Sequence, residues 1–194
     1  MTRRATLMIG LVLLGGCLSK SEVPAPRFFR PGPVVPRQAD AAQAPLEERA
    51  PLRLRDVSAA AHLRDRMVWS TPALEYGFYD GARWTEAPAS YVEAALTGAL
   101  FERGAFRRGS GADAPVLDVH VAAFEEVVGS GSHEATVVLR VLLVGPDGAA
   151  RLEDTFVGKR PVPQDDPAAV AAAMGEALDE AVRRTVAAVE GAGR

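Results

Sequence analysis

Cys17 is the only cysteine of this 194-residue chain and its first candidate for chemistry. It ends an apolar run, residues 5–14, that Arg3 and Arg4 precede and small residues follow. A short basic stretch followed by about ten apolar residues is typical of an export signal, and it is too short to span a bilayer. The sequence Leu-Gly-Gly-Cys at positions 14–17 fits the bacterial lipobox, in which a peptidase cuts before a cysteine that carries diacylglycerol. We therefore expect residues 1–16 to be a signal peptide.

We expect Cys17 to be acylated, with palmitate or a similar fatty acid. The alternative interpretation, that Cys17 is a buried structural cysteine, leaves the preceding apolar run unexplained. A disulfide within the chain requires a second cysteine. Thr6 stands where the twin-arginine export motif prefers a large apolar residue, so we expect the general secretory route. Leu18 is not the aspartate that usually retains lipoproteins in the inner membrane, which favours an anchor in the outer membrane.

Other reactive groups form no catalytic or metal-binding pattern. The histidines His62, His120 and His133 have no partner at ligand spacing, and no serine lies in a Gly-x-Ser-x-Gly sequence. The pairs Glu125-Glu126 and Asp165-Asp166 are explained by solvation in a strand, where neighbours face opposite sides, and by capping at a helix start. We expect no enzyme activity, no metal and no cofactor.

Four aromatic residues gather before the first predicted helix: Tyr76, Phe78, Tyr79 and Trp84. Such residues either pack in the core or line a surface for a partner or substrate, and the sequence leaves both interpretations open.

The charge balance argues against nucleic acid as a partner. Removal of Arg3 and Arg4 with the signal changes 22 positive and 25 negative side chains to 20 and 25. Nucleic-acid phosphates are bound by clustered positive groups. A chain with a net charge of −5 is therefore a poor candidate for binding nucleic acid.

A proline-rich segment follows Cys17, and residues 17–50 are predicted to be a tether because proline removes backbone donors and fixes φ. Arg27-Phe28-Phe29-Arg30 interrupts it and could add a first strand to the edge of the domain.

The domain itself is predicted to span residues 51–194. Short strands are indicated at 52–55, 67–69 and 74–79, and a helix capped by Thr85, with Pro88 in its first turn, runs to about residue 103. Strands near 117–123, 136–144 and 151–159, joined by glycine-containing turns at 129–132 and 145–148, form an antiparallel meander. A last amphipathic helix follows Pro167. We expect a two-layer α+β fold in which two helices pack on a mostly antiparallel sheet.

This order of elements resembles the ABC-type transport auxiliary lipoprotein family, the PqiC-like lipoproteins that accompany MCE-type transport systems. In that family a tyrosine-bearing strand leads to an arginine- and tryptophan-containing segment that opens the first helix, as residues 76–88 do. The resemblance covers about residues 25–190, and the sequence departs from it at Phe28-Phe29, where the family often has tyrosine and leucine.

The resemblance implies a non-enzymatic partner of an MCE-type protein and of ABC transporter components, which helps lipids or other hydrophobic solutes through the envelope. It leaves open whether the protein forms a homo-oligomer. An anchored α+β domain could instead be a periplasmic regulator of a peptidoglycan synthesis enzyme, and this alternative stays open.

Overall fold

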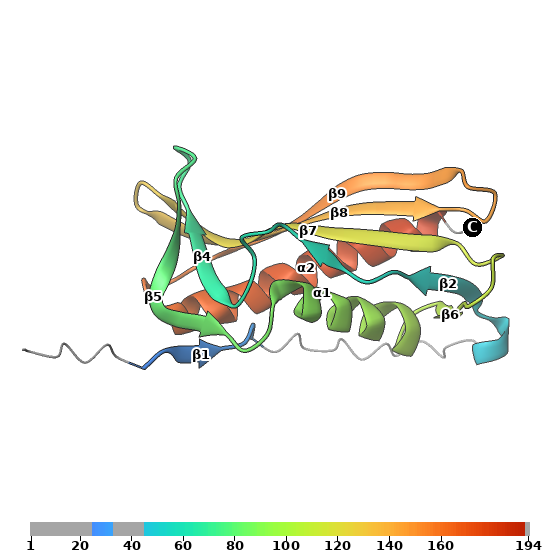
Figure 1. Ribbon diagram of the computed structural model, residues 1–194, viewed down its shortest axis with the longest axis horizontal. Helices are drawn as coiled ribbons and strands as arrows, with labels where there is room; N and C mark the ends of the chain where they lie inside the picture. Colours follow the sequence, from blue (N-terminus) through green and yellow to red (C-terminus); the bar gives the residue numbers. More distant parts are fainter. Residues whose placement is uncertain (1–24, 33–44, 193–194) are drawn as a thin grey trace, which may run out of the picture.

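The computed structural model describes residues 25–32 and 45–192, which form one long mixed sheet with helices on one side (Figure 1). The strands are β1 (Arg27–Phe29), β2 (Ala50–Leu54), β3 (Ser58–Ala59), β4 (Arg66–Ser70), β5 (Tyr76–Trp84), β6 (Phe106–Arg108), β7 (Val116–Gly129), β8 (Ser132–Val144) and β9 (Ala150–Pro161). The helical segments are η1 (Leu46–Glu48), α1 (Pro88–Thr97), the π-helical turn η2 (Gly98–Glu102) and α2 (Pro167–Ala192).

The meander β7–β8–β9 is antiparallel, as predicted. Its first turn contains Gly131 with φ of 82° and its second Gly148 with φ of 77°, a backbone region that glycine adopts without strain. The Gly148 N–H donates to the Gly145 carbonyl at 2.9 Å, which confirms the predicted tight turn.

The other edge of the sheet is parallel, which the sequence prediction missed. Along β7 lie β2, β3 and β4, all parallel to it, while β4 is antiparallel to β5. Parallel neighbours need a crossover connection, and α1 lies within the connection from these strands to β7. The α+β prediction is therefore confirmed, with a mixed rather than a mostly antiparallel sheet.

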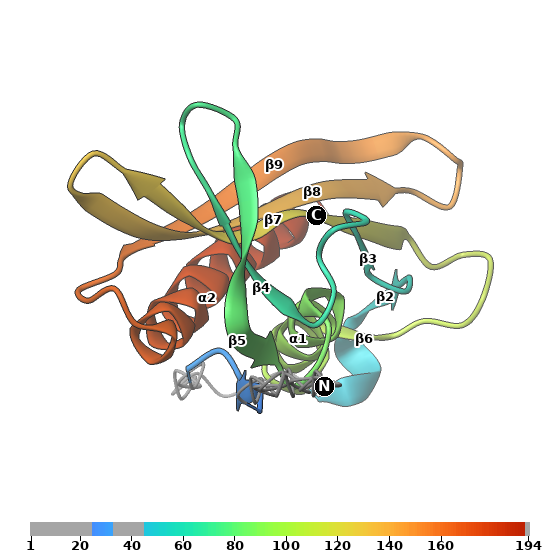
Figure 2. The same ribbon diagram turned by 60° about the vertical axis from the view of Figure 1, so that its left-hand side comes forward.

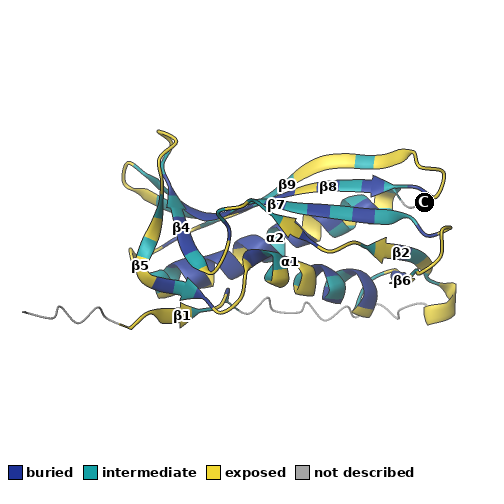
Figure 3. Cartoon of the chain, in the orientation of Figure 1, coloured by how far each residue is buried: buried dark blue, intermediate teal, exposed yellow. Residues whose placement is uncertain are grey.

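Helix α2 covers the inner face of the meander, and Figure 3 shows its dark buried side turned to the sheet. Its predicted apolar stripe is buried at Val170, Met174, Ala177, Leu178, Ala181, Val182 and Val189. A side chain at Gly158 of β9 would overlap the Ala177 carbonyl, so the helix backbone lies directly on the strand. Among the described residues, no helix is both long and apolar enough to cross a membrane.

The two helix starts differ from each other. The Asp166 carboxylate accepts from the Ala168 N–H at 3.2 Å, as predicted for a cap of α2. Pro88 begins α1 as predicted, but the N-cap residue is Ala87, which has no side-chain acceptor. The predicted cap by Thr85 is wrong, because its hydroxyl pairs instead with the Tyr91 hydroxyl at 2.7 Å.

Strand β1 lies inside the predicted tether and is part of the folded sheet. It pairs with β5 in parallel, and the Phe29 carbonyl accepts from the Thr85 N–H at 2.8 Å. After it, the Gly32 N–H donates to the Ala171 carbonyl at 2.8 Å. A side chain at Gly175 would overlap Gly32, so this segment is packed tightly against α2. The proposed first strand is thereby confirmed, and the domain boundary at residue 51 stays a prediction.

Candidate functional site

Most of the exposed large apolar side chains belong to three strands at one end of the molecule. In the described part of the chain, the exposed ones are Phe28, Leu46, Leu74, Tyr76 and Phe78. All but Leu46 belong to β1 or to the hairpin of β4 and β5, which projects from the body of the protein (Figure 2). We call this hairpin with β1 the aromatic edge. Exposed apolar side chains that follow one another along such an edge indicate sites of interaction.

The tip of the hairpin has a leucine at a backbone position where glycine is usual. The Leu74 N–H donates to the Thr71 carbonyl at 3.0 Å, and the Thr71 N–H donates to the Glu75 carbonyl at 2.9 Å. This is a three-residue loop whose last residue adopts the left-handed conformation, a position usually taken by glycine. Leu74 occupies it with φ of 65° and a residue exposure of 86%. The chain thus holds a large apolar side chain in water at a strained position.

Arginine side chains lie next to the aromatic residues along this surface. The Arg66 guanidinium lies 4.1 Å from the centre of the Phe78 ring. Arg66 is paired with Arg83, which is paired in turn with Phe28, and aligned residues of neighbouring strands project to the same side. Arg83 bonds to the Asp65 carboxylate at 3.0 Å. Aromatic and arginine side chains are the types enriched in protein interfaces.

The four aromatic residues that precede the first helix divide into two groups. Tyr76 and Phe78 are exposed by 57% and 37%. Trp84 is only 1% exposed and packs edge-on against Phe124 with ring centres 5.4 Å apart, so of the two interpretations left open by the sequence, packing in the core holds for Trp84. The bulge around Gly81, with φ of 69°, comes between the exposed and the buried aromatics. Tyr79 is half-buried and points to the base of the hairpin.

At that base, Glu126 is fully buried and holds two strands together. Its carboxylate accepts a hydrogen bond from the Tyr79 hydroxyl of β5 and pairs with His133 Nδ1 of β8 at 2.7 Å. Burial raises the pKa of Glu126, although the hydrogen bond and the charge of His133 oppose this and Asp165 adds a small further rise.

Its neighbour Glu125 is 6% exposed on the other side of the strand. The Ser70 hydroxyl donates to its carboxylate at 2.8 Å, and His62 Nε2 lies 4.0 Å from its second oxygen. The two glutamates do face opposite sides, but their explanation by solvation is wrong. Both are buried where β4 pairs with β7, a long-range pairing that strand periodicity alone does not reveal.

These buried groups are suited to structure more than to catalysis. Ser70 donates to a carboxylate and not to a histidine, so its oxygen is not activated as in a hydrolase triad. No group of three metal-ligating side chains occurs within residues 25–32 and 45–192. The chemical role that the geometry supports is to fix the hairpin on the sheet, so that its aromatic side chains are held in place.

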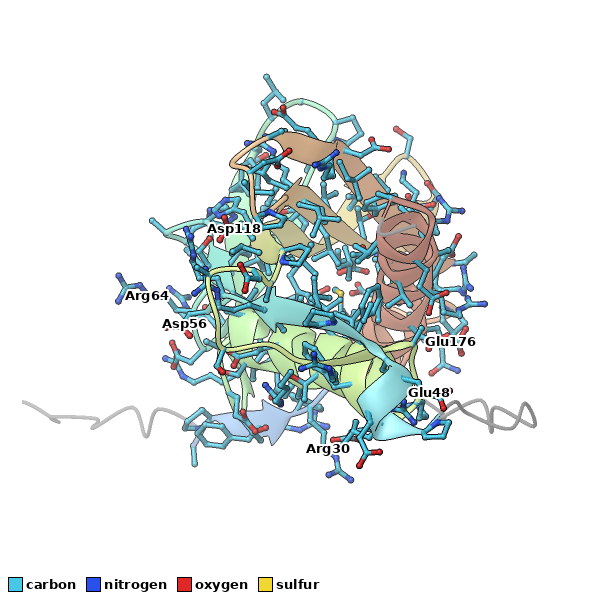
Figure 4. All side chains as sticks on the ribbon, turned by 90° about the vertical axis from the view of Figure 1, so that its right-hand side faces the viewer. Arg30, Glu48, Asp56, Arg64, Asp118 and Glu176 are labelled. Atoms are coloured by element: carbon cyan, nitrogen blue, oxygen red, sulfur yellow. The ribbon has the colours of Figure 1, made fainter. Side chains whose placement is uncertain are left out.

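A polar hollow of about 780 Å³ lies on the outer face of β7, β8 and β9. Asp56 and Asp118 face this side, away from Glu176 of α2 (Figure 4). Its walls are internally paired: Arg55 bonds to Asp118 at 3.1 Å, and Ser58 to His120 at 2.9 Å. The hollow is an open, solvated face of the sheet.

Comparison with known proteins finds a matching family and solved structures with a similar fold. A family model described as the ABC-type transport auxiliary lipoprotein component matches residues 34–186. A Xanthomonas campestris protein of the DUF330 family has a crystal structure that is 25% identical, with a TM-score of 0.69 over 86% of this chain and 96% of that one. A hypothetical Chlamydia trachomatis protein shares the fold at 10% identity, with a TM-score of 0.55 over 75% of this chain and 98% of that one. Among curated proteins, no sequence matches.

Proposed function

Because the chain belongs to the ABC-type transport auxiliary lipoprotein family, we propose that it is a non-catalytic, lipid-anchored accessory component of an ABC transport system. In this proposal it works with an MCE-type protein in the passage of lipids or other hydrophobic solutes through the bacterial envelope. The observation that supports it most is the family match over residues 34–186, together with a surface rich in exposed aromatic side chains.

The anchor in this proposal is an acylated Cys17, which lies outside the described residues. One acyl chain binds a membrane only marginally, whereas the two or three chains of a bacterial lipoprotein anchor it stably. Leu18 favours the outer membrane as the location, with the domain facing the periplasm. The Cys17→Ser variant should leave the membrane fraction or remain uncut, and unchanged fractionation with an unchanged mass would reject the anchor.

The contact surface for the partner is, in our proposal, the ridge formed by Leu74, Tyr76 and Phe78 on the hairpin. These side chains are exposed, and their surroundings carry charges of both signs from Arg66, Glu75 and Asp80. An apolar ridge with polar neighbours has the composition of a protein-binding patch. Tyr79 and Trp84 support the ridge from inside and are unsuitable for testing contact.

Crosslinking in intact cells tests this proposal. A photoreactive amino acid in place of Tyr76 should capture an MCE or ABC component, while the same group in place of Glu176 should not. Glu176 is a suitable control because its side chain is 70% exposed and lies on α2. Capture of peptidoglycan synthesis enzymes without any transport component would reject the proposal in favour of a regulator of cell-wall synthesis.

A substitution pair tests whether the contact matters for function. Tyr76→Ala should weaken recovery of the partner and sensitise cells to membrane-perturbing agents. Leu46→Ala is the matched control, since Leu46 is 62% exposed but lies on η1, outside the aromatic edge. Equal effects of the two substitutions would argue against the ridge as the contact surface.

A further inference from the structure

The docking of β1 shortens the connection between the domain and Cys17. Only residues 18–26 separate Cys17 from Arg27, the first residue of β1. Ten residue steps of at most about 3.5 Å limit the distance between the two Cα atoms to about 35 Å in any conformation. If the whole segment 17–50 were a tether, the domain could move much farther away.

The exposed residues at this edge of the molecule have the chemistry of a membrane contact. Phe28 is 60% exposed, and Arg27 and Arg30 on either side of the Phe28-Phe29 pair are also exposed. Residues 25–32 contain no acidic residue. Aromatic side chains prefer the boundary between headgroups and acyl chains, and arginines near an anionic membrane are attracted to its surface.

The remainder of the aromatic edge points elsewhere. In Figure 1, β1 lies at the lower margin of the molecule, and the tip of the β4–β5 hairpin lies at the upper margin. The tip carries Leu74 next to the acidic Glu75, a charge that an anionic surface repels. The two ends of the aromatic edge therefore suit different partners, a lipid surface at β1 and a protein at the hairpin.

We propose that β1 is a membrane foot, in which Phe28 enters the headgroup region of an anionic phospholipid surface while Arg27 and Arg30 contact its phosphates. This inference rests on the proposed acylation of Cys17 and deepens it. The foot orients the domain, because a surface fixed at β1 directs the hairpin tip away from the membrane and toward a partner.

Tryptophan quenching tests the membrane foot in the full mature chain. The lipidated protein is placed in vesicles of phosphatidylethanolamine and phosphatidylglycerol that carry brominated acyl chains. Phe28→Trp should add a quenched fluorophore, and Leu74→Trp, at the opposite margin, should add an unquenched one. The native Trp69 and Trp84 are present in both variants and in the wild type, so the signal is the difference from the wild type.

Substitutions that remove the charges of β1 and its flank provide a second test of the membrane foot. Each arginine near an anionic surface contributes about 1 kcal/mol, so replacing Arg27 and Arg30 by glutamine should lower the ratio of docked to undocked domain about thirtyfold. The quenching of Phe28→Trp should fall accordingly, and it should also be weaker in vesicles of phosphatidylcholine alone. Arg183→Gln with Arg184→Gln, on α2, is the charge-matched control and should leave the quenching of Phe28→Trp unchanged.

Failure of the foot and failure of the anchor are distinguishable. Mass spectrometry reports acylation of Cys17 independently of fluorescence. If Cys17 proves unacylated, its thiol is coupled to a maleimide lipid, and the quenching measurement is then made on the same vesicles. An anchored chain with no quenching at position 28, or with equal quenching at positions 28 and 74, would overturn the membrane foot.

Discussion

The meander packed against α2 and the hairpin of β4 and β5 differ in which side chains are buried. The inner face of β8 is buried by apolar residues throughout, and Val137, Leu139, Val141 and Leu143 are each at most 2% exposed. The hairpin leaves Tyr76 and Phe78 in water, and the strand with which it pairs, β7, buries the carboxylates of Glu125 and Glu126. The meander is thus organised for stability, whereas the hairpin has the features of an interaction surface.

Two backbone positions, Gly158 in the meander and Leu74 in the hairpin, show the same difference between packing and surface exposure. Gly158 lies where any side chain would overlap α2, so glycine is required for packing. Leu74 lies at a positive φ where glycine would be less strained, yet a large apolar residue is present. Strain that folding does not require is a recognised feature of functional positions.

The largest effect is expected from Gly158→Ala. The added methyl group meets the backbone of α2, which cannot move like a flexible side chain, and we expect a loss of about 3 kcal/mol in the free energy of unfolding. Urea denaturation measures it. Gly191→Ala, at a helix position with open space, should be neutral or slightly stabilising, and similar losses for both would contradict the packing argument.

Tyr79→Phe should cost about 2 kcal/mol, because it removes a hydrogen-bond donor from the buried Glu126 carboxylate. Thermal unfolding of the variant would show the loss. Tyr76→Phe removes the same hydroxyl from an exposed side chain and should leave stability unchanged. If the two variants are equally stable, the bond at the base of the hairpin contributes nothing.

Glu126→Gln should change the pH dependence of stability by an amount on the order of 1 kcal/mol. The raised pKa of Glu126 means that its contribution to stability is fully present below the ordinary pKa of 4.5 and is lost as pH rises through the folded-state value. The glutamine variant should therefore gain stability relative to the wild type as pH rises. Denaturation at several pH values tests this, with Glu176→Gln as an exposed control, and a constant difference would contradict it.

The contribution of Glu180, on α2, to stability should depend on pH in the opposite direction to that of Glu126. Burial alone would raise its pKa, but the hydrogen bond and charge of Arg160, together with the charge of Arg184, lower the pKa of Glu180. Its contribution is present above the ordinary pKa of 4.5 and lost as pH falls through the lowered value. Glu180→Gln should cost about 1 kcal/mol near neutral pH, and the loss should fade in acid. A loss that grows in acid would be inconsistent with this pairing.

The smallest effect on stability is expected from Leu74→Gly. Relief of the left-handed conformation is partly offset by the greater freedom of glycine in the unfolded chain, so we expect a gain of at most about 1 kcal/mol. Recovery of the partner should nevertheless decrease, because the variant loses an exposed apolar contact. Unchanged recovery with unchanged stability would remove Leu74 from the proposed contact surface.

Local patterns in the sequence predicted much of this fold. Alternating apolar residues and glycine-containing turns predict the meander, and the apolar stripe from Val170 to Val189 predicts α2. These features depend on neighbours in the chain, which is why they are readable without the tertiary structure. The aromatic residues before α1 were also evident, but not which of them reach the surface.

Only the tertiary structure decided where distant segments meet. Parallel pairing of β4 with β7 buries Glu125 and Glu126, which a strand pattern assigns to solvent. The bulge at Gly81 precedes the turn of Trp84 into the core, while Tyr76 and Phe78 remain outside. Pairing of β1 with β5 places Phe28 on the surface, only eleven residues after Cys17 in the sequence. Each outcome depends on contacts between residues far apart in sequence, and those contacts, not local periodicity, determine what is exposed.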